Sequence, residues 1–141
     1  MIEVKTLEKT FGDQKVLKGI STRFEAGQTN LIIGQSGSGK TVFLKSLLGI
    51  HTPEVGTISF DGRIYSELDK DEKRELRTEI GMVFQGSALF DSMTVEENVG
   101  FPLKMFTNKT AEEIKERVNV VINRVNLVDA NHKKPSEISG G

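Results

Sequence analysis

The chain has 141 residues, of which 36% are hydrophobic and 28% are charged, a balance typical of a soluble globular protein with a sizeable core. The formal net charge is −1, so no bulk attraction to nucleic acid or to an anionic membrane is expected. The absence of cysteine excludes disulfides and thiolate metal sites, and no apolar stretch approaches the ~20 residues of a membrane-spanning helix.

The first part of the chain predicts mainly strands. Residues 2–7 and 16–24 read as two strands joined by a turn. Residues 29–33 are a short apolar run, which predicts a strand buried on both faces of a parallel sheet. Asp61 and Gly62 stand between apolar residues and predict a β-hairpin. A further strand is expected at residues 80–84.

Helices are predicted at residues 41–48, at the highly charged residues 68–77, and after two capping boxes that begin at Thr94 and Thr110. The mixed charge of residues 68–77 favours a solvated helix over a nucleic-acid-binding surface. The helix after Thr110 is amphipathic, and its expected apolar stripe comprises Ile114, Val118, Val121, Ile122 and Val125.

Residues 34–41 read GQSGSGKT and match the phosphate-loop pattern G-x-x-x-x-G-K-[ST]. Glycines allow the backbone to approach phosphate closely, and successive N–H groups at the start of a helix form an anion site. Lys40 would supply a charge for the β and γ phosphates, and the Thr41 hydroxyl would ligate Mg²⁺. A flexible Gly/Ser turn is the alternative, but the apolar run before the motif and the helix after it favour nucleotide binding.

Four motifs in order resemble the ATP-binding domain of ABC proteins. Phe11-Gly12 precedes the phosphate loop, as the family's adenine-stacking aromatic does. Residues 81–85, GMVFQ, resemble the Q-loop, and residues 135–141, PSEISGG, resemble the run into the signature motif, with Ile138 in place of leucine. The stretch from residue 84 to residue 103 is most similar to importer-type ATPases, closest to those of MCE/Mla-type lipid transport systems.

This resemblance implies ATP and Mg²⁺ as cofactors and assigns the site residues. Lys40 and Gln85 would be catalytic, and Thr41 and Gln85 would contact the metal. The nucleotide would contact Phe11, Val16, Gly34, Ser36, Gly37, Ser38, Gly39, Lys40, Thr41, Ser139, Gly140 and Gly141.

Structural alternatives stay open for several of these residues. Phe11 could be an ordinary strand aromatic, Gln85 a solvated strand end, and residues 139–141 a Ser/Gly tail. His51 and His132 are both expected at the surface without an assigned role.

The resemblance also implies an α/β fold, a truncated P-loop NTPase core of ABC type. An N-terminal antiparallel β subdomain would lie with the core in residues 1–90, and a partial α-helical subdomain in residues 91–141. The full-length protein would form a head-to-tail homodimer and bind a transmembrane subunit at the cytoplasmic face of the cell membrane. Six apolar residues could line the groove for that subunit or form the helical core: Leu89, Phe90, Met93, Val99, Phe101 and Leu103.

The sequence stops within the expected signature motif, and the family's acidic pair and switch histidine are not found in it. We therefore expect this chain to bind ATP but to hydrolyse it negligibly. An unpaired apolar edge at residues 29–33 would make it self-associate. Two alternatives stay open: a soluble ABC ATPase without a transport role, and a natural truncated nucleotide-binding protein.

Overall fold

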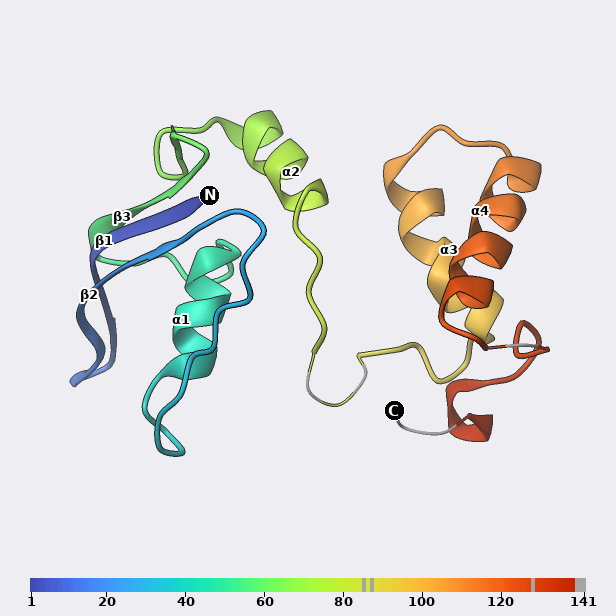
Figure 1. Ribbon diagram of the computed structural model, residues 1–141, viewed down its shortest axis with the longest axis horizontal. Coiled ribbons are helices and arrows are strands. Elements are labelled where there is room, and N and C mark those ends of the chain that lie inside the picture. Colours follow the sequence, from blue (N-terminus) through green and yellow to red (C-terminus); the bar gives the residue numbers. More distant parts are fainter. Residues whose placement is uncertain (85, 87, 128, 139–141) are drawn as a thin grey trace. The chain divides into compact units, whose positions relative to one another are not determined.

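The computed structural model describes residues 1–84, 86, 88–127 and 129–138. The chain divides into two compact units, Met1–Gly81 and Met82–Gly141, which are described separately (Figure 1). The division falls earlier than the expected boundary after residue 90. The rings of Phe90 and Phe101, with centroids 4.7 Å apart, both belong to the second unit.

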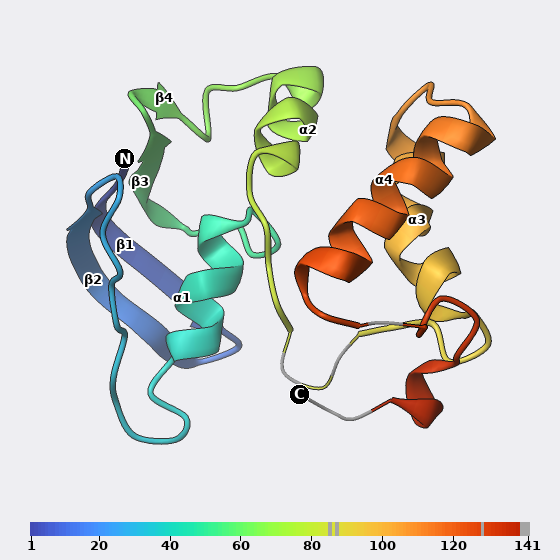
Figure 2. The same ribbon diagram turned by 45° about the vertical axis from the view of Figure 1, so that its right-hand side comes forward.

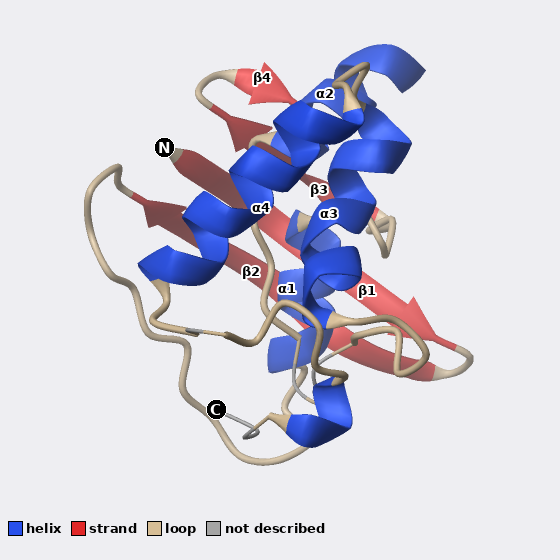
Figure 3. Ribbon diagram, turned by 90° about the vertical axis from the view of Figure 1, so that its right-hand side faces the viewer, coloured by secondary structure: helices blue, strands red, loops and turns tan. Residues whose placement is uncertain are grey.

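The first unit is built on a four-stranded antiparallel sheet in the order β2-β1-β3-β4, seen in red in Figure 3. The expected first hairpin is confirmed, with both of its strands longer than expected because pairing continues to Phe11↔Gln14 at the turn. The Asp61-Gly62 hairpin is also confirmed, since both residues have positive φ, as a type I′ turn requires. The strands are β1 (Ile2–Phe11), β2 (Gln14–Phe24), β3 (Val55–Phe60) and β4 (Arg63–Ile64).

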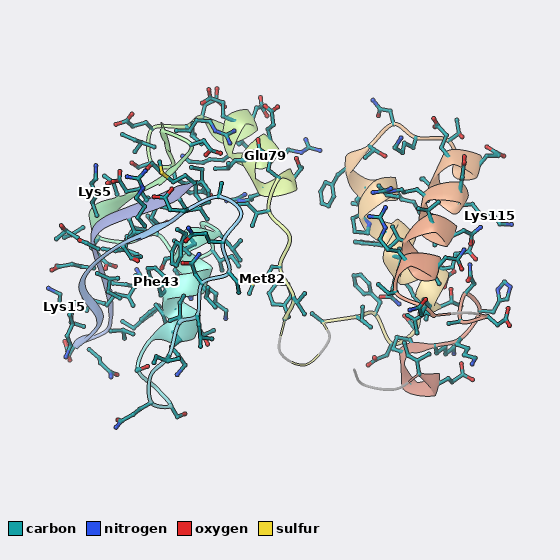
Figure 4. The ribbon with its side chains drawn as sticks, viewed as in Figure 1. Lys5, Lys15, Phe43, Glu79, Met82 and Lys115 are labelled. Atoms are coloured by element: carbon teal, nitrogen blue, oxygen red, sulfur yellow. The ribbon has the colours of Figure 1, made fainter. Side chains whose placement is uncertain are left out.

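Two helices complete this unit, α1 (Lys40–Leu47) and α2 (Lys70–Thr78), as Figure 2 shows. Phe43, labelled in Figure 4, and Leu47 turn inward from α1, while Leu76 does so from α2. The buried core comprises Val4, Leu7, Leu17, Phe43, Leu47, Ile58, Phe60 and Leu76. Burial of this one face of the sheet against the helices is the main stabilising contribution.

The expected strands at residues 29–33 and 80–84 are wrong: both segments are irregular. Leu31 is 86% exposed and Val83 is 98% exposed, whereas a strand inside a parallel sheet would bury both. In the described part of the chain no other strand pairs with either segment. An apolar run becomes a strand only where a neighbour satisfies its backbone groups, and the run itself does not supply that neighbour.

The second unit contains α3 (Val95–Phe106), α4 (Ala111–Arg124) and a short 3₁₀ helix, η1 (Pro135–Glu137). Both expected capping boxes are confirmed. Thr94 accepts a hydrogen bond from Glu97 N at 3.2 Å while its own N–H donates to the Glu97 carboxylate at 2.8 Å, and Thr110 pairs with Glu113 in the same way.

The two long helices pack closely where Gly100 of α3 is buried against α4. A Cβ at Gly100 would lie 3.3 Å from Ile114 Cγ2 and 3.4 Å from Val118 Cγ2. The expected stripe is correct for the buried residues Ile114, Val118 and Ile122. It is wrong for Val125, which is 60% exposed because α4 ends one residue earlier, at Arg124.

The six apolar residues considered for a partner groove divide between two environments. Val99 and Leu103 pack against the helical core. Leu89 and Phe90 are exposed, and Met93 and Phe101 are half-buried.

Candidate functional site

The phosphate-loop motif forms a turn that ends at the first residue of α1. Gly39 precedes the helix in the left-handed region, with φ +92°, and a Cβ there would lie 3.0 Å from Val16 Cγ1. Only glycine combines this backbone conformation with such a close approach. The loop therefore lies directly on β2 at Val16, a residue expected to contact the nucleotide. The structure thereby brings Val16 and the loop together.

The start of α1 is suited to an anion. The first-turn N–H groups of a helix have no intrahelical partners, and the helix dipole places partial positive charge there. The first turn of α1, all of it described, carries no acidic residue and does carry Lys40. Gly34, Gln35, Ser36, Gly37 and Ser38 are all exposed, so the backbone of the loop is accessible to a ligand.

Lys40 bridges its own loop. Its Nζ donates hydrogen bonds to the carbonyl oxygens of Gly34 at 2.8 Å and Gln35 at 2.7 Å. These bonds hold the ammonium group across the loop, where it adds a full charge to the partial charge of the helix end. The sequence located this lysine, but not the two carbonyls that orient it.

Thr41 is exposed in the first turn of α1, beside Lys40. Among the described residues, no group of three or more His, Cys, Asp and Glu side chains could hold a metal ion. A Mg²⁺ ion typically keeps several waters and takes few protein ligands together with phosphate oxygens. The Thr41 hydroxyl fits that role.

Phe11 ends β1, across the turn from the strand that carries Val16. It is 44% exposed, and its ring makes an edge contact with that of His51, with the ring centroids 5.2 Å apart and the planes at 79°. Sequence reasoning gave His51 no role, because no local pattern links residue 51 to residue 11. The remaining expected site residues, Gln85, Ser139, Gly140 and Gly141, lie outside the described residues.

Glu54 lies in the same loop as His51, and the sequence did not indicate its contacts with the end of β1. Its carboxylate accepts hydrogen bonds from Lys9 Nζ and, at 2.9 Å, from Thr10 N. The Lys9 hydrogen bond, followed by that of Thr10 N, holds the pKa of the Glu54 carboxyl group below its usual value, which favours its charged form.

The first unit also contains a cavity of about 550 Å³ between β2, residues 30–34 and the start of α1. Its lining is largely apolar and includes Phe24, Leu31 and Phe43, together with Gly34, Gly39 and Lys40 of the phosphate loop. In the described part of the chain, no helix is both long enough and apolar enough to cross a membrane.

A glycine-rich turn with a lysine and a threonine at the start of a helix defines the P-loop class of nucleotide-binding proteins. The ABC transporter family model matches residues 17–141, and the chain belongs to that family. Two solved structures of the cassette MJ0796 confirm the fold class. One, titled as a dimer in a post-hydrolysis state bound to ADP and Pi, is 31% identical with a TM-score of 0.83, over 99% of this chain and 64% of that one. The other has a TM-score of 0.85.

Two curated relatives match almost the whole chain. The probable ribonucleotide transport ATP-binding protein mkl of Mycobacterium leprae is 42% identical over 99% of this chain and 40% of its own length. The chloroplastic protein TRIGALACTOSYLDIACYLGLYCEROL 3 of Arabidopsis thaliana is 39% identical over all of this chain and 41% of its own length. The chain thus spans about two fifths of the length of these relatives.

Proposed function

We propose that this chain is the nucleotide-binding portion of an ABC transporter ATPase, which couples ATP binding and hydrolysis to movement of a transmembrane partner. The observation that carries the proposal is the loop of residues 34–41, pressed against β2 at Gly39 and leading into the positive end of α1. Family membership supports the same function, as do relatives named as import ATP-binding proteins, PotA of Nitrosospira multiformis and MetN of Brucella abortus.

The site residues that the structure describes each have a role in this proposal. The loop N–H groups and the start of α1 hold the phosphates, and Lys40 offsets the charge of the β and γ groups. Mg²⁺, with Thr41 as a ligand, would supply further charge compensation when bound. Phe11, which is 44% exposed, would stack on adenine, and Val16 would pack against the loop at Gly39.

Further parts of the proposal concern the full-length protein. Two copies would close head to tail, with Ser139, Gly140 and Gly141 of one copy facing the γ-phosphate held by the other. Gln85 would contact Mg²⁺ and respond to the membrane partner at the cytoplasmic face. The relatives are named for different cargoes, so the proposal assigns the ATPase role, with MCE/Mla-type lipid transport as its finer form.

Calorimetric titration of the chain with ATP and Mg²⁺ tests the proposal. The variant Lys40→Ala should lower ATP affinity at least tenfold, which is about 1.4 kcal/mol, because it removes the only full charge of the first turn of α1. Lys45→Ala is the matched control, since Lys45 lies in the last turn of the same helix. Equal affinities of Lys40→Ala and the wild type would contradict the proposal.

A further inference from the structure

The ring of Phe11 is held by two neighbours from different parts of the first unit. The ring of His51 meets it edge to face, with centroids 5.2 Å apart. The Nζ atom of Lys9 lies 5.2 Å from the Phe11 ring centroid, within the range of a cation–π contact. Both contacts depend on where the ring points, so together they select one orientation of it.

Lys9 is itself fixed by the loop that carries His51. Glu54 binds Lys9 Nζ with one carboxylate oxygen and Thr10 N with the other, and its own N–H donates to Glu8 O at 3.1 Å. The Lys9 side chain is only 14% exposed, so it is less free to leave this position than an ordinary surface lysine. The end of β1 and residues 51–54 are therefore joined by backbone and side-chain bonds.

The same loop is attached to the helix that starts at the phosphate loop. The N–H groups of Ile50 and His51 both donate to the carbonyl oxygen of Lys45 in the last turn of α1, at 2.9 and 3.3 Å. His51 is thus anchored at one end of α1, and the other end begins at Lys40. A continuous path of backbone bonds links the phosphate-binding loop to the residue that contacts Phe11.

We propose that His51, together with the Lys9–Glu54 pair, positions the ring of Phe11 for the adenine base and so sets the affinity for the base without contacting the phosphates. This inference rests on the proposed nucleotide-binding function. Phe11 is 44% exposed, so part of the residue is accessible to a base. His51 and Glu54 are positioning residues, because they act through Phe11.

The test compares two ligands, ATP and inorganic tripolyphosphate, which has the phosphate chain but no base. We expect His51→Ala to lower ATP affinity roughly threefold to tenfold, the size of one aromatic contact, and to leave tripolyphosphate affinity unchanged. Glu54→Gln should act in the same direction, since it removes the charge that holds Lys9. His51→Phe should restore ATP affinity, because it returns an aromatic ring to the contact. His132→Ala, at an exposed site of the second unit, is the control.

The outcomes separate this inference from the function on which it rests. If His51→Ala weakens ATP and tripolyphosphate equally, or weakens neither, the positioning role is wrong. If the wild-type chain binds tripolyphosphate as tightly as ATP, the base contact is wrong but the phosphate site stands. A wild-type chain that binds neither ligand overturns both proposals. Thermal unfolding of each variant shows whether it folds, and Glu54→Gln keeps the test decisive if His51→Ala is unfolded.

Discussion

Gly39 is under a stricter structural requirement than Gly37 of the same loop. A Cβ there would lie 3.0 Å from Val16 Cγ1, 3.3 Å from Leu17 Cδ2 and 3.4 Å from the Val16 carbonyl oxygen. Gly37 has a similar positive φ, +77°, but a Cβ there would meet nothing within 4 Å. The two glycines therefore share the backbone requirement, and Gly39 alone of the pair has the steric one.

We expect Gly37→Ala to destabilise the chain by about 1–2 kcal/mol, the cost of a left-handed residue with a side chain. Gly39→Ala should cost about 1–3 kcal/mol more, because its methyl group would force the loop away from β2. Urea unfolding of both variants, monitored by circular dichroism, measures the difference. Equal unfolding free energies would show that β2 does not constrain the loop.

At the start of α3, the side chain of Asn98 makes hydrogen bonds in addition to those of the capping box. The capping box at Thr94 was readable from the sequence, but the side chain of Asn98 was not singled out there. Asn98 Oδ1 accepts from Phe90 N at 2.8 Å, and its Nδ2 donates to the carbonyl oxygens of Phe90, Met93 and Thr94 at 3.1, 3.3 and 2.9 Å. One amide thus fastens the preceding loop to the first turn of the helix.

The variant Asn98→Ala should destabilise the chain by about 1–3 kcal/mol, because it removes the side-chain hydrogen bonds to the Phe90 N–H group and to the partly buried Met93 carbonyl oxygen. Asn123→Ala, an exposed position on α4, is the control and should change stability little. Hydrogen exchange of the second unit would show faster exchange at the Phe90 amide in Asn98→Ala. Unchanged exchange there would mean that the loop is held without Asn98.

At the scale of the whole molecule, the property of interest is self-association, which we expect to depend on exposed apolar residues just before the phosphate loop. Leu31 is 86% exposed and Ile33 is 81% exposed, and both line the cavity beside β2. Apolar side chains with accessible backbone groups beside them recruit other chains. Self-association therefore stays a prediction, and Leu31 and Ile33 are the residues expected to cause it.

We expect the chain to self-associate with rising concentration, and the double variant Leu31→Glu with Ile33→Glu to shift it toward monomer. Val125→Glu is the control, since Val125 is 60% exposed but lies in the second unit. Sedimentation velocity over a range of concentrations measures the effect. A wild-type chain that stays monomeric at high concentration would refute the prediction.

The sequence by itself determined the features that depend on short-range geometry. The spacing of Gly34, Gly39, Lys40 and Thr41, the Asp61-Gly62 turn and the threonine caps all specify a backbone conformation within a few residues, so they could be predicted. Only the tertiary structure decided which apolar runs become strands and which distant residues meet. Residues 29–33 have an apolar run but no paired neighbour among the described residues, and His51 reaches Phe11 because β3 pairs with β1. These contacts join residues that are far apart in the sequence. A local sequence pattern therefore does not reveal which segments will pair.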